Sequence, residues 1–395
     1  MSLPLVGIRV VEYAQYVAGP LCGVLLADLG AEVVKVEPPN GDGYRHVMPA
    51  APGVGRFFVP LNRGKRSVVA DLKSAKGRDT SERLLASADV VLHNFLPERA
   101  ARYGLAWGDL HAAHPTLVVG RVTSFGTSGP LAEAPAYDLV AQARAGLLTA
   151  HASPGDTVPV RAGGIPMADL TAGFLLATGV LAALVRARET GIGELVDTSL
   201  LAAALAVQVQ DLVWLPGEAK ADDVALADRA YLRARAGEIA SGVAMNPYYR
   251  CFETADGFVA VACLNVVQRR AFLGLFGLDD PTIDAPDLVP NDPAVLAAKE
   301  TLTAAIADAF RERLVADWLG RLEAAGVPCG SVQQRETIYA DPQVGAEALI
   351  AEVEQEDLGV VRLLAPFVRV GGDACAAAPA PSLGADTESV LAELR

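Results

Sequence analysis

The chain has 395 residues, of which 52% are hydrophobic and 20% are charged. This length and composition exclude a disordered protein and are sufficient for two or three domains with a large core. The formal net charge of −14 argues against a broad nucleic-acid-binding surface, so we expect no nucleic-acid partner. The five cysteines include no C-x-x-C pair, which indicates reduced thiols and predicts no bound metal.

The sequence carries no signal for export or for membrane insertion. Its first residues lack the basic region and following apolar region of a signal peptide. The most apolar window, residues 174–185, is too short to span a bilayer and is flanked by Asp169 and Arg186. We therefore expect a soluble, cytoplasmic protein without a membrane partner.

Strand-like and helical stretches alternate through the first third of the chain. Short runs rich in β-branched residues predict strands, and helical spacing lies between them. The expected strands are 8–13, 31–37, 67–72, 89–95 and 117–125, and the expected helices include 20–29 and 80–88. This alternation predicts a doubly wound α/β domain with a parallel sheet.

The loops that follow the expected strands contain several cations, although the chain as a whole is acidic. Sheets of this kind bind ligands beyond the carboxyl ends of their strands. Any one of these strand-end cations is most simply a solvated loop residue, but together they suggest a polyanionic ligand. They are Arg45, Arg63, Lys65, Arg66, Lys73, Arg99 and Arg102. The turn after the first strand reads G-P-L-C-G and lacks the G-x-G-x-x-G pattern, which disfavours a nicotinamide or flavin dehydrogenase.

Two carboxylates lie at the starts of helices that follow the fifth strand. Asp138 begins an expected helix over residues 138–148, and Asp169 begins a long apolar helix that ends near Gly191. From their positions alone, the simplest interpretation is that each of them caps its helix. An ionised carboxylate at a helix start can also take a proton or attack a carbonyl, because the helix dipole favours its charged form. The residues themselves leave this choice open.

A series of short motifs lies in order along nearly the whole chain. They are L-x-G-I-R-V-V-E-Y, L-A-D-L-G-A-E-V-V-K-V-E-P-P, N-R-G-K-R-S, A-D-V-V-L-H-N-F, S-F-G-T-S-G-P, Y-D-L-V-A-Q-A, P-x-x-D-x-x-A-G, N-P-Y-Y, G-V-P-C-G-S-V and P-S-L-G-A-D-T. With these motifs the chain resembles the class III CoA-transferases. That superfamily also contains formyl-CoA transferase, carnitine CoA-transferase and α-methylacyl-CoA racemase.

The resemblance implies an enzyme that moves CoA from an acyl-CoA donor to a small carboxylic acid acceptor. Coenzyme A is then a substrate, and no permanently bound cofactor is expected. In the family, the aspartate that matches Asp169 attacks the acyl-CoA carbonyl and forms a mixed anhydride, which the released CoA converts to an aspartyl-CoA thioester. The family's CoA-binding residues match Val17, Ala18, Lys73, Asn94, Phe95, Arg102 and Tyr137.

The resemblance also implies the architecture. It predicts a doubly wound, Rossmann-like large domain, a smaller α+β domain and two chains that interlock as a homodimer. Together with a hairpin signal at Asp256-Gly257 and helical spacing over 292–313 and 316–325, it sets the expected boundaries. These are a large domain over 1–200 and 326–395, a linker over 201–224 and a small domain over 225–325.

The chain departs from the family pattern at three places. Pro38 follows Glu37 where some members have an arginine, and residues 218–249 contain no run of glycines before a glutamine. In the racemases a histidine precedes the first aspartate, but here that residue is Tyr137, whose usual pKa of about 10 makes it a poor base. A transferase is therefore favoured. An α-methylacyl-CoA racemase or acyl-CoA isomerase, and a non-catalytic CoA-binding protein, are the alternatives.

Overall fold

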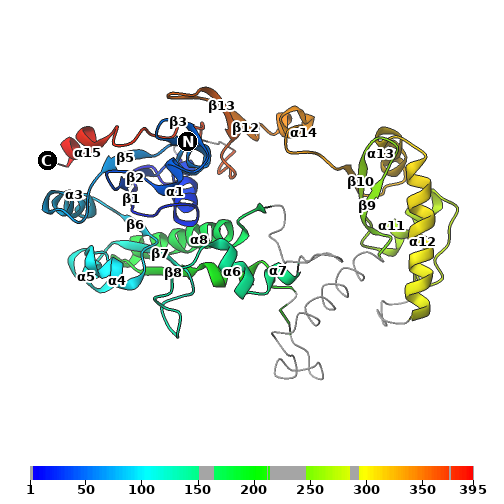
Figure 1. The fold of residues 1–395 in the computed structure, drawn as a ribbon, viewed down its shortest axis with the longest axis horizontal. Helices are drawn as coiled ribbons and strands as arrows, with labels where there is room; N and C mark the ends of the chain where they lie inside the picture. The colour runs from blue at the N-terminus through cyan, green and yellow to red at the C-terminus, as the bar shows by residue number, and fades with distance from the viewer. Residues whose placement is uncertain are drawn as a thin grey trace. The chain divides into compact units, whose positions relative to one another are not determined.

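A computed structural model of the chain describes residues 3–150, 164–210, 212–213, 246–284, 293–372 and 375–394. The chain forms two compact units (Figure 1). The first unit comprises Met1–Leu148, Arg161–Glu218 and Pro342–Arg395, and the second comprises Thr149–Val160 and Ala219–Asp341.

The first unit is built on a six-stranded sheet with the strand order β5-β2-β1-β6-β7-β8. Its strands are β1 (Arg9–Glu12), β2 (Glu32–Glu37), β5 (Arg66–Val69), β6 (Val90–His93), β7 (Val118–Thr123) and β8 (Leu195–Ser199). Every pairing within the sheet is parallel, which confirms the predicted mixed α/β fold with a parallel central sheet. The strand order changes direction between β1 and β6, so a ligand crevice is expected beyond the carboxyl ends of these two strands.

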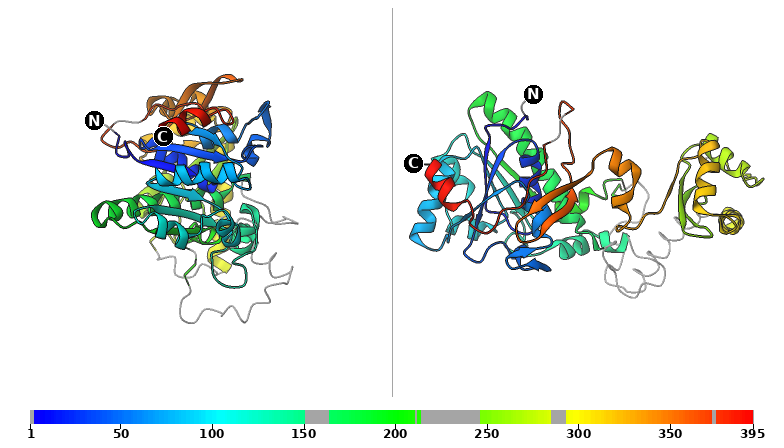
Figure 2. Two further views of the ribbon diagram at one scale, coloured as in Figure 1. Left: turned by 90° about the vertical axis from the view of Figure 1, so that its left-hand side faces the viewer. Right: turned by 90° about the horizontal axis from the view of Figure 1, so that it is seen from above.

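Helices cover both faces of this sheet (Figure 2). On one face, α1 (Ala18–Asp28) and α8 (Met167–Thr190) pack with strand residues such as Val10 and Leu92. On the other face, α3 (Ala75–Ala86) and α5 (Trp107–Ala113) pack with the alternate residues of the same strands. Because the strands are buried on both faces, they are continuous apolar runs rather than alternating ones, and this made them recognisable in the sequence.

The remaining elements of the first unit are short. The helices are η1 (Gly43–Arg45), α2 (Phe58–Asn62), α4 (Pro97–Arg102), α6 (Asp138–Arg144), α7 (Leu147–Ala150), α9 (Leu200–Ala206), α14 (Pro342–Ala346) and α15 (Thr387–Glu393), and the strands are β3 (Pro49–Ala51), β4 (Val54–Gly55), β12 (Ile350–Gln355) and β13 (Gly359–Leu364). The single helix expected over 138–148 is divided into α6 and α7, because Gly146 between them has a φ of +77°. The sequence patterns described above do not predict α4, α5 or β8.

Helix α8 has 24 residues and is long and apolar enough to cross a membrane, so its apolar run exceeds the expected window of 174–185. It is nevertheless a core helix of the first unit. Its buried residues pack on α1 and on the sheet. At Gly173 a Cβ atom would lie 2.8 Å from the carbonyl oxygen of Ala18 and 2.9 Å from Cβ of Leu21. Glycine therefore allows α8 to cross α1 this closely, which places the start of α8 beside the start of α1.

The second unit has a three-stranded antiparallel sheet and several helices. Its elements are β9 (Tyr249–Glu253), β10 (Phe258–Ala262), α11 (Val266–Gly274), α12 (Pro293–Arg311), α13 (Val315–Ala324), β11 (Cys329–Ser331) and η4 (Ile338–Ala340). The stacked aromatic rings of Phe252, Phe310 and Trp318 form the centre of its core. Strands β9 and β10 form the hairpin that Asp256-Gly257 predicted.

The chain returns to the first unit at Pro342 and not at residue 326, where the return was expected. The physical reason is that β11 pairs with β10, which keeps residues 329–331 in the second unit. Half of the expected linker over 201–224 and the expected start of the small domain lie outside the described residues.

Candidate active site

A cavity of about 750 Å³ lies at the carboxyl ends of β1, β2, β5, β6 and β7, within the first unit. Its walls are the loops that follow these strands, together with the start of α8. Most of the expected site residues line it, namely Val17, Ala18, Lys73, Asn94, Phe95, Tyr137 and Asp169. Arg102 is not among the residues that line it. The cavity therefore collects residues that are far apart in the sequence, at the position that the strand order favours.

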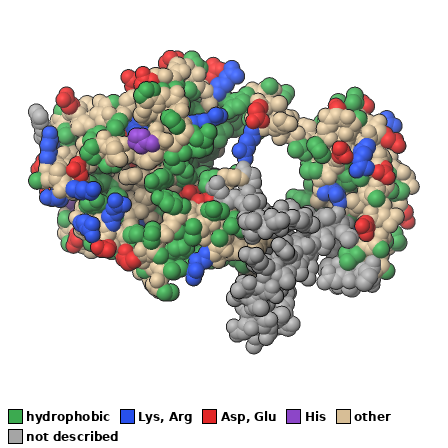
Figure 3. Space-filling model, viewed as in Figure 1, with side chains coloured by type: hydrophobic (Ala, Val, Ile, Leu, Met, Phe, Trp, Pro, Cys, Tyr) green, Lys and Arg blue, Asp and Glu red, His purple; other side chains and the backbone are tan. Residues whose placement is uncertain are grey.

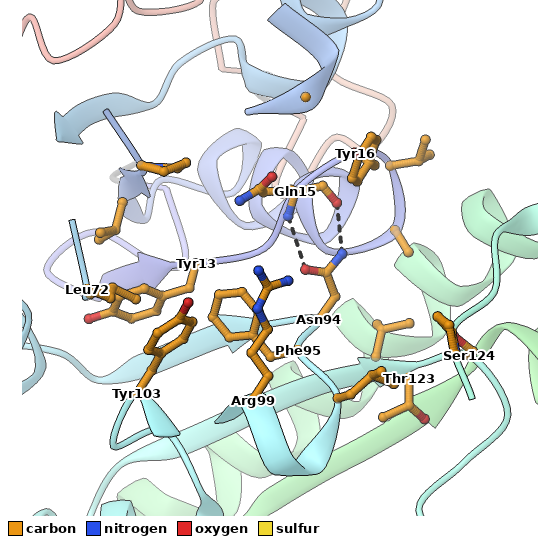
Figure 4. Close-up of a pocket in the computed structure, with 18 of the residues that line it drawn as sticks. Tyr13, Gln15, Tyr16, Leu72, Asn94, Phe95, Arg99, Tyr103, Thr123 and Ser124 are labelled. Atoms are coloured by element: carbon orange, nitrogen blue, oxygen red, sulfur yellow. Dashed lines mark hydrogen bonds between the residues drawn. The ribbon is translucent and has the colours of Figure 1, made fainter. Parts of the chain in front are cut away.

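The two arginines of α4 differ in position relative to the cavity. Arg102 lies on the surface, where it forms an exposed ion pair of 2.9 Å with Glu98. Arg99 lines the cavity, and its guanidinium carbon lies 5.5 Å from the centre of the Phe95 ring and 6.0 Å from that of Tyr103. Figure 4 shows the guanidinium group of Arg99 pointing into the cavity above Phe95. The structure thus brings Arg99 into the candidate site in the place expected for Arg102.

Several of the strand-end cations are bound to carboxylates of the protein itself. The ion pairs are Arg45–Glu37, Arg63–Asp28, Lys65–Glu12 and Arg66–Glu32. The expectation that these four cations bind a polyanionic ligand is wrong, because each already has a carboxylate partner and all but Arg66 are buried. Removing a charge from water is costly, and a close partner of opposite charge offsets that cost. Among the residues of the cavity wall that the structure describes, the cations are Lys73 and Arg99.

The buried ion pairs hold the loops that form the cavity wall. Glu12, fully buried at the end of β1, lies 3.0 Å from the ammonium group of Lys35 and 2.8 Å from that of Lys65. The same ammonium group of Lys35 donates a hydrogen bond to the carbonyl oxygen of Ala14 and lies 2.9 Å from Asp42. These bonds join the end of β1, the loop before α1 and the loop after β2. They therefore determine the shape of one wall of the cavity.

Tyr16 adopts a backbone conformation that is uncommon for a residue with a side chain. Its φ is +69°, in the left-handed region, and its N–H donates to a carboxylate oxygen of Asp42. The side chain of Asn94 binds both the N–H and the carbonyl of the neighbouring Gln15, as the dashed lines in Figure 4 show. Strained residues of this kind cluster at functional sites, where the surrounding structure holds them in place. Sequence reasoning missed Tyr16, although it lies beside Val17 in a strand-end loop.

The ring of Tyr16 packs edge-on against that of Tyr137, with ring centres 5.6 Å apart. Burial and the hydrogen bond with Tyr137 raise the pKa of Tyr16, so its hydroxyl is neutral near pH 7. The side chains of Tyr16 and Tyr137 both lie in the wall of the cavity that contains Asp169.

Asp169 lies in the first turn of α8 and is half-buried. The helix begins at Met167 after Pro166, so Asp169 is not its N-cap. Instead, Asp138 accepts hydrogen bonds from the N–H groups of Ala168 at 2.9 Å and of Asp169 at 3.4 Å. The expectation that Asp138 caps its own helix is wrong, because its carboxylate reaches across to α8. Sequence position could not show this, since the two helix starts are brought together only by the fold.

Comparison with known proteins decides the family. The model of CoA-transferase family III matches residues 5–387. The chain belongs to this family. It is 34% identical to the succinate–glutarate CoA-transferase of Agrobacterium fabrum, over 99% of this chain and 96% of that protein. It is 30% identical to the succinyl-CoA:glutarate CoA-transferase of Homo sapiens, over 99% of this chain and 86% of that protein.

Solved structures agree with this assignment. A CaiB/BaiF family protein from Brucella suis matches with a TM-score of 0.79 and 29% sequence identity, over 100% of both chains. This family III protein is therefore a CoA-transferase, as its motifs predict.

Proposed function

We propose that this CoA-transferase works by covalent catalysis on Asp169. The observation that supports this role most strongly is the position of Asp169 at the start of α8, in one cavity with the residues that match the family's CoA contacts. The positive end of the α8 dipole favours the ionised carboxylate, and a partly buried site leaves it less shielded by water. Both conditions favour attack on a thioester.

The proposed reaction balances without any redox step. The Asp169 carboxylate attacks the thioester carbonyl, a C–O bond forms, the C–S bond breaks and CoA leaves as the thiolate. The thiolate then attacks the aspartyl carbonyl of the mixed anhydride, which expels the donor acid and leaves an aspartyl-CoA thioester. The acceptor carboxylate then attacks the aspartyl carbonyl of this thioester, which expels CoA thiolate a second time and forms a mixed anhydride of Asp169 and the acceptor acid. The thiolate attacks the acceptor acyl carbonyl of this anhydride, which forms the product acyl-CoA and restores the Asp169 carboxylate.

We propose dicarboxylic acids as the substrate class, with CoA bound as a substrate and not as a resident cofactor. Relatives over nearly the whole chain are named for succinate and glutarate. An acetyl-CoA:oxalate CoA-transferase of Acetobacter aceti is 30% identical, over 88% of this chain and 85% of that protein. These names support a small dicarboxylate as acceptor.

The purified protein, incubated with succinyl-CoA and glutarate, is expected to form glutaryl-CoA and succinate in equal amounts, measured by mass spectrometry. Valerate, which has the same chain length but one carboxylate, is the matched control acceptor and should react at least about tenfold more slowly, because one fewer charged group is bound. Equal rates with both acids would contradict the dicarboxylate preference.

Two further measurements separate the two alternative functions. A racemase or isomerase would exchange the α-proton of a branched acyl-CoA with deuterated solvent in the absence of any acceptor. A non-catalytic protein would bind CoA without turnover. Among the described histidines none lines the cavity, and burial lowers the pKa of His93 to about 4, so it stays neutral at the end of β6. This favours transfer over proton abstraction by a histidine.

Arg99 is proposed to bind the phosphorylated part of CoA. We expect Arg99→Ala to weaken CoA binding about tenfold or more, because a charge-assisted hydrogen bond contributes roughly 1.5–3 kcal/mol. The matched variant Arg102→Ala, which removes the surface cation one turn away, should change the dissociation constant less than about twofold. Isothermal titration calorimetry with CoA measures both. A larger effect of Arg102→Ala than of Arg99→Ala would instead assign the CoA contact to Arg102, which the motif indicated.

We further propose that the protein is an interlocked homodimer in the cytoplasm. Exposed apolar side chains on α8 and after β13 support a partner surface, among them Phe174, Val185, Phe367 and Val368. Figure 3 shows apolar side chains gathered on the face of the first unit that is turned to the viewer. Surfaces of this kind are usually covered by a partner. A mass of one chain by light scattering would contradict the dimer.

A further inference from the structure

The carboxylate of Asp138 is an unusual buried charge beside the proposed nucleophile. It is 4% exposed and lies at the start of α6, yet it binds the backbone of another helix, α8. One oxygen accepts from the N–H groups of Ala168 and Asp169, at 2.9 and 3.4 Å. The other oxygen accepts from the side-chain amide of Gln142 at 2.8 Å. Both oxygens therefore have donors, as a buried anion requires.

The two backbone donors belong to the first turn of α8, where a helix cannot satisfy its own N–H groups. Pro166 precedes the helix and has no side-chain acceptor to bind them. A carboxylate in a first helical turn tends to bind nearby backbone N–H groups itself. Because Asp138 binds the N–H groups of Ala168 and Asp169, the carboxylate of Asp169 does not have to serve as the acceptor for them.

The charge of Asp138 also matters through the proposed reaction. Asp169 alternates between an anion and a neutral anhydride or thioester, whereas Asp138 remains an anion that does not take part in bond formation. The positive end of the α8 dipole therefore keeps a negatively charged partner when Asp169 becomes acylated. The first turn of α8 can retain its geometry in every state of the cycle.

We propose that Asp138 is a positioning residue for the CoA-transfer reaction. It binds the backbone of the first α8 turn and so directs the Asp169 side chain toward the acyl-CoA in the cavity. This role rests on the proposed function of Asp169. It differs from the role of a second base, since the Asp138 carboxylate is hydrogen-bonded to groups of the protein and does not line the cavity.

The test compares Asp138→Ala with Asp138→Asn in the full-length protein. We expect the alanine variant to lower kcat about 100-fold, because small displacements of a reacting group have effects of that size, while CoA affinity changes less than about twofold. Asparagine keeps an oxygen that can accept from the N–H groups of Ala168 and Asp169. Its NH2 group can donate to the side-chain oxygen of Gln142 once the amide group of Gln142 has rotated by about 180°. It should therefore restore kcat to within about tenfold of the wild type.

A second readout does not depend on turnover. Hydrogen exchange of the backbone amides at Ala168 and Asp169 should be faster in Asp138→Ala than in the wild type and in Asp138→Asn. The control is Asn265→Ala, which removes the cap of α11 in the second unit (Asn265 accepts from the N–H of Gln268 at 2.9 Å). That variant tests the loss of a helix cap as such and should leave kcat within about twofold of the wild type.

The outcomes separate this inference from the function on which it rests. Unchanged kcat in Asp138→Ala, or an asparagine variant as slow as the alanine variant, would overturn the positioning role. A parallel loss of kcat and CoA affinity would indicate a general structural role and would also overturn it. If the wild type transfers no CoA, the proposed function fails, yet the exchange of the two amides still shows whether Asp138 holds the turn. If the alanine variant does not fold, the asparagine variant decides. A kcat within about tenfold of the wild type, together with wild-type exchange of the two amides, supports the positioning role, and a larger loss of kcat overturns it.

Discussion

Replacement of Asp169 by alanine is expected to lower kcat by a factor of about 10⁴ or more. The variant retains the cavity but lacks the carboxylate that forms the new C–O bond in the proposed reaction. Asp169→Asn is the closer comparison, because it keeps the size and the hydrogen-bonding capacity of the side chain and removes its nucleophilic charge. Both variants should bind CoA with an affinity within about threefold of the wild type, since the residues matching the CoA contacts are unchanged.

Trapping with hydroxylamine locates the intermediate directly. Incubation of the wild type with acyl-CoA and hydroxylamine should convert one aspartate to a hydroxamate, found by peptide mass spectrometry. Among the described residues of the cavity wall, the carboxylates are Asp71 and Asp169, so the label distinguishes two candidates. Modification of Asp71, or undiminished transfer by Asp169→Ala, would refute the assignment.

The second large effect is expected on stability, from Glu12→Ala. This substitution leaves the ammonium groups of Lys35 and Lys65 buried without the carboxylate between them. Breaking a buried ion pair in this way costs roughly 3–5 kcal/mol, so the midpoint of unfolding in urea should fall markedly. Asp42 remains as a carboxylate partner of Lys35, but Lys65 loses the carboxylate with which it is paired. Helix α1 is also packed closely against Glu12, since a Cβ on Gly23 would lie 1.9 Å from a carboxylate oxygen of Glu12.

Glu32→Ala is the matched control for Glu12→Ala. Glu32 also bridges two cations, Arg9 and Arg66, but its side chain is 34% exposed at the sheet surface. Water and salt weaken such pairs, and a loss of no more than about 1 kcal/mol is expected. Similar urea midpoints for the two variants would show that burial does not decide the contribution of these ion pairs.

The parallel sheet could be predicted because its strands are short, continuous apolar runs separated by helical spacing. Elements without such a pattern were missed. Strand β8 reads L-V-D-T-S, and only its pairing with β7 makes it part of the sheet. The break between α6 and α7 depends on the left-handed conformation of Gly146, which one glycine in a helical pattern does not specify.

The candidate site also has features that the sequence predicts and features that depend on the fold. The sequence by itself determined the family, the sheet and the strand-end loops, because motifs and apolar runs are local properties of the chain. Those loops did supply the cavity wall, including Lys73 and Asn94.

Only the tertiary structure decided which charges remain available to a ligand and which are paired within the protein. Lys65 and Arg45 are cations in the sequence but buried ion-pair partners in the fold, and Arg99 rather than Arg102 faces the cavity. It also brought Asp138 to the start of α8, where it binds the backbone beside Asp169. The physical reason is that burial, partner distance and side-chain direction follow from contacts between distant segments. Residue type and spacing along the chain do not specify these contacts.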